Sequence, residues 1–157
     1  MRLVIDTNIL LDVLLNRYPY VDQSSQIWRL CETGQVEGHV LTLSFANLVY
    51  VMRKRLAPDL IGSILGKIAL IFQFADLRYG DLERAAALGW SDYEDAIHSV
   101  TAERLHADYI ISRNPKDFSQ SRVPAITPAA FLELFIRIAN MDAGTGMMQE
   151  EQKAYEP

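Results

Sequence analysis

The chain has 157 residues, half of them hydrophobic and 22% charged, a composition typical of folded globular proteins and not of disordered or fibrous ones. This length favours a single domain with a sizeable core. Twenty acidic and fifteen basic residues give a net charge of −5, which argues against a broad basic surface for nucleic acid, so any phosphate binding must be local.

The sequence has neither the pattern of a targeting segment nor enough cysteines for disulfides or a metal cluster. No apolar run is long enough to span a bilayer, and the N-terminus lacks the arrangement of a signal peptide. Cys31 is the single cysteine, so neither a disulfide framework nor a cysteine metal cluster is expected. These features predict a cytoplasmic protein that makes no membrane contact.

The first half of the chain alternates short apolar segments with segments of helical periodicity. The β-branched, apolar segment Arg2–Ile5 predicts a buried strand, and the apolar positions from Ile9 to Leu15 repeat with helical spacing. The same criteria predict a helix over Val21–Glu32, a strand over Gly38–Leu43 and a helix capped by Ser44. The buried stripe of that last helix comprises Phe45, Leu48, Val49, Met52 and Leu56.

The second half continues the alternation. Its predicted elements are a helix over 61–71, a strand over 72–77, a helix over 81–88, a helix from Asp92 to His106 with Ser91 and Glu94 as a capping box, strands over 109–112 and 123–127, and a helix over 128–138. This order predicts the α/β class: a three-layer α/β/α sandwich with a mostly parallel central sheet. Residues 1–139 form the predicted domain, and the Gly- and Gln/Glu-containing segment 140–157 is predicted to be a disordered C-terminal tail.

Acidic residues lie at several predicted edges of this sheet. Asp6 follows the first strand, Asp92 and Asp95 share the first turn of a helix, and Asp117 follows the strand over 109–112. If the first and fourth strands are neighbours, these carboxylates meet at one carboxyl edge. Crowded carboxylates repel unless a cation lies between them, and oxygen ligands without Cys or clustered His favour Mg²⁺ or Mn²⁺.

Each acid also has a purely structural interpretation. Asp6 can cap the following helix, Asp95 can complement a helix dipole, and Asp117 can close a turn. Three acids at edges of one sheet are less easily explained as three unrelated caps. Trp28 and Trp90 are interpreted as packing residues rather than as base-stacking platforms.

Three segments resemble the signature blocks of PIN domains, which are Mg²⁺- or Mn²⁺-dependent ribonucleases. They read VIDTNILLD, SFANLVYVMRKRL and DYEDAIHSVTAERLHADYIISRNPKDF, and the resemblance extends from about Met1 to Leu134. It implies RNA as substrate and homodimerisation, with the helix over 61–71 as the candidate surface. Many bacterial members are toxins of VapBC-type pairs blocked by a small partner protein, so an antitoxin is a candidate partner.

The family resemblance also assigns site residues by position. Asp6 resembles the family's first acid, Asp95 the third and Asp117 the fourth, while Asp92 resembles an extra acid that can hold a metal-bound water. Asn47 departs from the pattern, because most members place Glu there. The neutral amide puts the metal affinity and the number of ions in question, without implying loss of function.

The implied mechanism is hydrolysis of an RNA phosphodiester by a metal-bound water, with Asn47 counted among the catalytic residues. Asn8, Ser112 and Asn114 are predicted to support the site. The candidate phosphate contacts are Arg113, Lys116 and Lys54.

Two alternatives remain open at this point. A PIN-like module that binds RNA or protein without cutting is favoured by Asn47 and by the negative net charge. An aspartate-nucleophile phosphotransferase would use Asp6 as nucleophile, but such enzymes want a second Asp two residues later, where this chain has Asn8.

Overall fold

The computed structural model describes the backbone of residues 1–153 and the side chains as far as residue 141. Five parallel strands form one sheet in the order β3-β2-β1-β4-β5. The strands are β1 Arg2–Ile5, β2 Glu37–Leu41, β3 Gln73–Ala75, β4 Tyr109–Ile111 and β5 Ala125–Ile126. The helices are α1 Thr7–Leu14, α2 Val21–Glu32, α3 Thr42–Met52, α4 Pro58–Ile71, α5 Tyr79–Leu88, α6 Tyr93–Arg104 and α7 Pro128–Lys153, with a short 3₁₀ helix, η1, over Pro115–Phe118.

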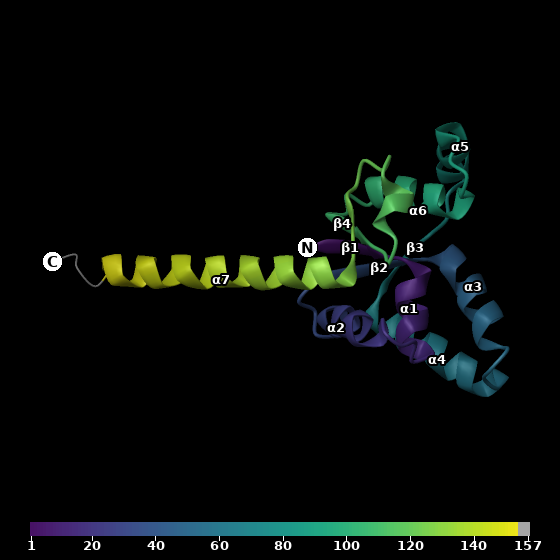
Figure 1. Ribbon diagram of the computed structural model, residues 1–157, viewed down its shortest axis with the longest axis horizontal. Helices are drawn as coiled ribbons and strands as arrows, with labels where there is room; N and C mark the ends of the chain where they lie inside the picture. The colour runs from purple at the N-terminus through teal and green to yellow at the C-terminus, as the bar shows by residue number, and fades with distance from the viewer. Residues whose placement is uncertain (154–157) are drawn as a thin grey trace.

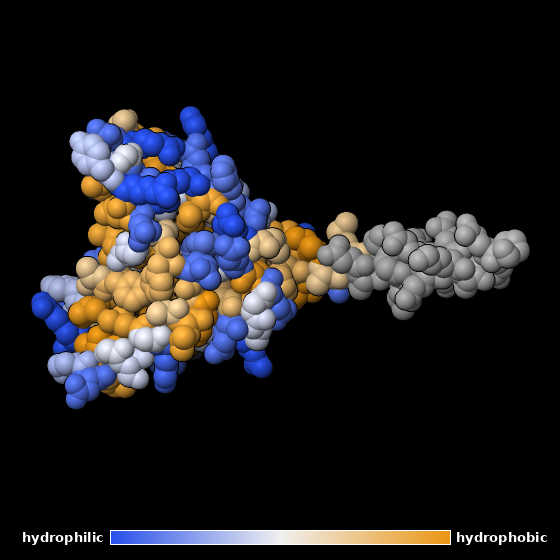
Figure 2. All heavy atoms as spheres, turned by 180° about the vertical axis from the view of Figure 1, so that it is seen from behind, coloured by the Kyte–Doolittle hydropathy of each residue, from blue (hydrophilic) through white to orange (hydrophobic). Residues whose placement is uncertain are grey.

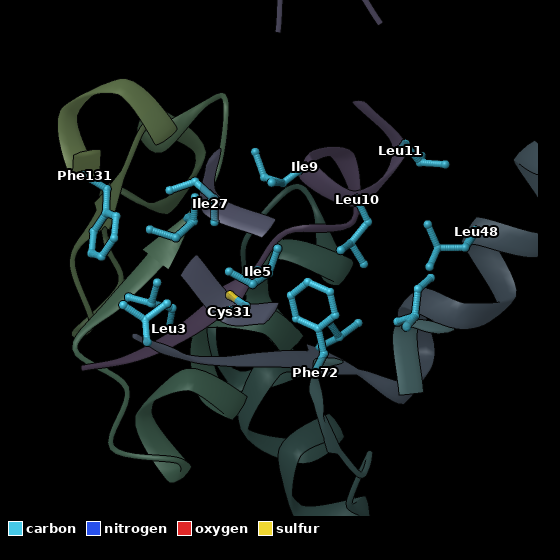
Figure 3. Packing of buried hydrophobic residues seen from close by; sticks show 14 of the residues in the cluster. Leu3, Ile5, Ile9, Leu10, Leu11, Ile27, Cys31, Leu48, Phe72 and Phe131 are labelled. Carbon is cyan, nitrogen blue, oxygen red and sulfur yellow. The ribbon is translucent and has the colours of Figure 1, made fainter. Parts of the chain in front are cut away.

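Helices cover both faces of the sheet, which confirms the predicted α/β/α sandwich (Figure 1). One buried cluster joins the sheet to α1, α2, α3, α4 and the start of α7, and a second joins the opposite face to α5, α6 and η1. Consecutive residues of β1 point to opposite faces, since Leu3 and Ile5 enter the first cluster (Figure 3) and Val4 enters the second. The uninterrupted apolar run of β1 is therefore the signature of a strand buried on both sides.

Gly38 is required where β2 passes under α2. A Cβ atom at this position would lie 2.6 Å from Cys31 Sγ and 2.9 Å from Phe72 Cδ1. Both side chains are buried in the first cluster (Figure 3).

We expect Gly38→Ala to lower the free energy of unfolding by about 1–3 kcal/mol, the usual cost of overpacking a core. Gly62→Ala is the matched control, because a Cβ there meets nothing within 4 Å and Ala favours the α4 helix over Gly. Urea unfolding of both variants measures the difference. Combining Gly38→Ala with Cys31→Ala should cost less than the sum of the single changes, and strict additivity would contradict the steric explanation.

Two predicted helix starts differ from the structure. Ser44 was expected to cap α3, but the N-cap is Leu41, and Ser44 lies buried inside the helix, where its Oγ accepts a hydrogen bond from Thr7 Oγ1 at 2.8 Å. For α6 the N-cap is Asp92, so the predicted Ser91–Glu94 capping box is wrong by one residue. Ser44 makes a tertiary hydrogen bond instead of capping α3. At α6 the N-cap position is taken by Asp92, whose side chain can cap a helix as well as that of Ser91.

The C-terminal helix α7 begins at the predicted Pro128 and continues to Lys153, and it projects from the body of the domain (Figure 1). Its backbone therefore covers most of the segment for which a disordered tail was predicted, while residues 154–157 lie outside the described part. The division at residue 139 stays a prediction. Among the described residues, no helix is long and apolar enough to cross a membrane.

The apolar stripe of α4, the predicted dimer surface, faces the protein. Ile61 and Ile68 are buried in the first cluster, and Ile64, Leu65 and Ile71 pack against it. The exposed apolar side chains of this region are others, namely Leu60, Leu70 and Phe74. The face seen from behind carries hydrophobic surface between polar side chains (Figure 2). Homodimerisation stays a prediction.

Candidate active site

Asp6 is fixed by two neighbouring strands. It follows β1 and caps α1, where its Oδ1 accepts a hydrogen bond from the Asn8 amide at 3.3 Å. Because β1 pairs with β4, Ile5 lies beside Ile111, and Ser112 Oγ donates to Asp6 Oδ2 at 2.8 Å. The first and fourth strands are thus neighbours, which was the condition for the carboxylates to meet at one edge. The capping interpretation of Asp6 also holds, and it does not compete with a role in a site.

Asp92 and Asp95 stand at the N-terminus of α6. Asp92 Oδ1 accepts hydrogen bonds from the Glu94 and Asp95 amides at 2.9 and 3.2 Å. These bonds fix the start of the helix and orient its first turn. The partial positive charge of this helix end favours nearby carboxylates.

Asp117 lies in η1, which follows β4. Asn114 Nδ2 donates to Asp117 Oδ2 at 2.6 Å, and the Asn114 amide donates to Ser112 Oγ at 3.1 Å. Since Ser112 in turn donates to Asp6, a chain of hydrogen bonds connects Asp117 with Asp6. The sequence predicted Asn8, Ser112 and Asn114 as supporting residues, and the structure shows which atoms each of them contacts.

These side chains line one hollow of about 480 Å³, which we call the site pocket. It is lined by Asp6, Thr7, Asn8, Leu11, Asn47, Tyr50, Val51, Asp92, Glu94, Asp95, Ser112, Arg113, Asn114 and Asp117. All predicted site residues except Lys54 and Lys116 are therefore brought together. Lys54 instead lies over the Tyr50 ring, 4.6 Å from its centroid, and Lys116 lines an adjacent hollow.

The carboxylates of the site pocket interact electrostatically. Burial, together with the negative charges of Asp92, Asp6 and Asp117, raises the pKa of Asp95 to about 6. Partial burial and like charges both disfavour the ionised form, whereas a bound cation would favour it. The donor set, made of carboxylate and amide oxygens, fits Mg²⁺ or Mn²⁺.

The acidic side chains of the site pocket are not, however, arranged around a common position for an ion. In the part of the chain that the structure describes, no group of three or more His, Cys, Asp and Glu side chains is arranged to hold a metal ion as it stands. The pocket supplies ligands of suitable chemistry, and binding a cation would require the carboxylates to move toward one another.

Comparison with known proteins assigns the family. A model of the PIN domain matches residues 2–116, which include Asp6, Asn47 and Asp95. The chain belongs to the PIN domain family. No curated protein sequence matches it.

Solved structures share this PIN fold. A toxin-antitoxin complex from Klebsiella pneumoniae aligns with a TM-score of 0.58 and 22% identity over 80% of this chain and 96% of that one. VapBC2 from Rickettsia felis, bound to a DNA fragment from its promoter, gives 0.61 and 14% over 81% and 98%. FitAcB from Neisseria gonorrhoeae gives 0.55 and 13% over 80% and 97%.

Glu94 is a residue of this PIN domain's site that the sequence interpretation missed. It lines the site pocket, and its Oε1 accepts a hydrogen bond from Asn47 Nδ2 at 2.8 Å. A carboxylate of α6 therefore lies beside Asn47, the position of α3 where most family members have Glu. Assigning Glu94 to a capping box concealed this contact.

A second feature missed from the sequence lies beneath the site. Asp12 of α1 is fully buried; Ser24 Oγ donates to its Oδ2 at 3.1 Å, and Arg113 Nη1 lies 3.3 Å from its Oδ1. The Arg113 guanidinium also lies over the Tyr20 ring, 4.4 Å from its centroid. Burial raises the pKa of Asp12, while the charge of Arg113 opposes that rise. An acid within the apolar run LLDVLL was the available signal, the same one that drew attention to Asp6.

Proposed function

We propose that this PIN domain is a Mg²⁺- or Mn²⁺-dependent ribonuclease that hydrolyses RNA phosphodiesters. One observation carries the proposal: Asp6, Asp92, Asp95 and Asp117, from three separate segments of the fold, line one pocket. Burial and the negative charges of the other three acids raise the pKa of Asp95. Such mutual repulsion costs stability, and a divalent cation offsets it.

The residues have distinct roles in this proposal. Asp6, Asp95 and Asp117 would hold the ion, and Asp92 would complete the shell through a water. When bound, the ion supplies positive charge opposite the phosphate and lowers the pKa of a water molecule. Ser112 and Asn8 keep the Asp6 carboxylate oriented, and Asn114 does the same for Asp117. Asn47, whose Nδ2 donates to Glu94, lines the same pocket and would orient the attacking water.

An antitoxin is part of the proposal as a protein partner. The structural relatives are described as toxin-antitoxin complexes or as VapBC and FitAB-type assemblies, which supports a VapC-like toxin. A module that binds RNA without cutting is the second candidate. It is favoured by Asn47, where a charged ligand would be usual in the family.

The test is cleavage of single-stranded RNA with Mg²⁺ or Mn²⁺, with a chelator as control, by the wild type and by Asp95→Asn purified in parallel. We expect cleavage by the wild type with metal, and none with chelator or with the variant. Cleavage that is equal in the two proteins, or that survives chelation, contradicts the proposal. A folded wild type that binds RNA without cutting it supports the second candidate.

Thermal unfolding provides an independent measure of the same cation site. In metal-free buffer at pH 7, Asp95→Asn should raise the melting temperature by about 2–4 °C, the shift that roughly 1 kcal/mol produces in a domain of this size, because the amide removes a repelled charge. Added Mn²⁺ should then raise the melting temperature of the wild type and leave that of the variant unchanged. Glu83→Gln, at an exposed position of α5, is the matched control and should follow the wild type.

A further inference from the structure

The site carboxylates lie between two hollows. Besides the site pocket, a hollow of about 520 Å³ is lined by Gly89, Trp90, Ser91, Lys116, Ser119 and Gln120. We call it the flanking pocket. Asp92, Asp95 and Asp117 line both. The two hollows therefore adjoin at these three acids, and the proposed ribonuclease reaction by itself requires only one of them.

The flanking pocket has the chemistry of a nucleotide site. Trp90 is partly exposed, and Phe118 packs edge-to-face against it with ring centroids 6.4 Å apart. Phe118 is itself buried in the second cluster, so the indole has a rigid support. Away from the three shared acids, Lys116 supplies one positive charge, and Ser91, Ser119 and Gln120 supply neutral hydroxyl and amide groups. An aromatic surface beside a cation and neutral hydrogen-bonding groups suits a base and its phosphate.

A comparable set lies on the other side of the carboxylates. Tyr50 lines the site pocket, is 53% exposed, and has Arg53 at 4.7 Å and Lys54 at 4.6 Å from its ring centroid. Each hollow is thus lined by an aromatic ring: Tyr50 has two cations beside it, and Trp90 shares its hollow with Lys116. In a chain of net charge −5, these are local sites for phosphate rather than part of a basic face.

We propose that a single-stranded RNA crosses the shared carboxylates, with one nucleotide in the flanking pocket, its base against Trp90 and its phosphate near Lys116. This inference rests on the proposed function and adds to it the path that the RNA strand takes across the site. A single strand can turn an unstacked base into such a pocket, whereas the bases of a duplex are held in their stack. Trp90, interpreted from the sequence as a packing residue, therefore both packs and binds.

The two tryptophans of the chain allow a direct test by fluorescence. Trp28 packs against Phe72 in the first cluster, so its emission should not respond to RNA. An eight-nucleotide single-stranded RNA is added to Asp6→Asn protein, which is not expected to cut it, in Mn²⁺. We expect quenching of tryptophan emission that persists with Trp28→Phe and disappears with Trp90→Phe, and no quenching by a duplex of the same sequence.

Affinity provides the second readout. Fluorescence anisotropy with the same labelled RNA should show at least about fivefold weaker binding for Trp90→Ala, the lower end of the loss expected for one base–aromatic stack. Lys116→Ala, at an exposed position, should weaken binding and reduce the salt dependence by about one phosphate contact. Lys67→Ala, at an exposed position of α4, is the charge-matched control and should change neither the affinity nor its salt dependence.

The outcomes separate this inference from the proposed function. Quenching that comes from Trp28, or RNA affinity unchanged in both Trp90→Ala and Lys116→Ala, overturns the course of the RNA even if the wild type cuts RNA with metal. A wild type that neither binds nor cuts RNA overturns both proposals.

Discussion

Asp6→Asn is expected to reduce RNA cleavage by about 10²–10³-fold or more. Removing one charged ligand from a metal site costs several kcal/mol of transition-state stabilisation, and each 1.36 kcal/mol is a factor of ten in rate. The measurement is the initial rate of RNA cleavage at saturating Mn²⁺ for wild type and variant.

The fold should survive this change. Asn is as good an N-cap as Asp, so its Oδ1 can still accept the bond from the Asn8 amide, and α1 should begin at the same residue. Circular dichroism and the melting temperature test this directly. Asp22→Asn, at an exposed position of α2, is the control for charge and should cut RNA at the wild-type rate. Wild-type activity in Asp6→Asn would remove the basis of the ribonuclease proposal.

The largest effect on stability is expected from Arg113→Ala. Arg113 lies 3.3 Å from the fully buried carboxylate of Asp12, and removing one partner of a buried pair leaves an uncompensated charge. The expected loss at pH 7 is about 3–5 kcal/mol, a large fraction of the roughly 5–15 kcal/mol by which a folded domain is ordinarily stable. Urea unfolding measures it. Arg113→Ala/Asp12→Asn should recover most of the loss, because the neutral amide can still accept the bond from Ser24.

The loss should depend on pH in a defined direction. Burial holds the pKa of Asp12 above its unfolded value, so the folded state binds this proton more tightly than the unfolded chain does. The contribution of Asp12 is therefore favourable below the unfolded pKa, about 4, and is lost as the pH rises through the raised folded pKa. Without Arg113 that pKa rises further, and the difference between variant and wild type should grow from pH 4 to pH 7. A pH-independent difference would show that Arg113 acts by packing on Tyr20 and not by charge.

This structural duty changes how Arg113 can be tested as an RNA contact. Arg113→Ala leaves the buried Asp12 carboxylate unpaired, and the resulting loss of fold stability is enough to reduce cleavage. Lys116 and Lys54 are therefore the better probes of phosphate binding. Arg113 lines the site pocket, and its predicted contact with RNA stays a prediction.

The sequence was sufficient to predict the fold because its signals are local. β1 is a doubly buried strand and reads as a continuous apolar run, and the parallel sheet follows from strands that alternate with helices. The gathering of Asp6, Asp95 and Asp117 follows as well, since the carboxyl ends of parallel strands share an edge and β1 pairs with β4. To predict that these three acids lie close together, little more than the order of the strands in the sheet is needed.

The remaining contacts depend on the exact rotation of helices, which no local pattern fixes. A capping box and a true cap at Asp92 differ by one residue, yet the choice decides whether Glu94 is read as a cap or as a partner of Asn47. The pairing of Asp12 with Arg113 joins residues about one hundred positions apart, and Ser44 turns from a presumed cap into an acceptor for Thr7. Tertiary packing overrides local preference at each of these positions.

The central position of β1 also determines when the site can exist during folding. Its neighbour β4 lies at the far end of the sequence, and the Ser112–Asp6 bond spans 106 residues. Contacts of such separation form late, because the loop they close must be ordered first. A nascent chain that has not yet reached Tyr109 can form β1, β2 and β3, but it lacks the strand that fixes Asp6 and the segment that carries Asp117. Assembly of the carboxylates therefore requires complete folding of the domain, and a partly folded chain should lack the proposed nuclease activity.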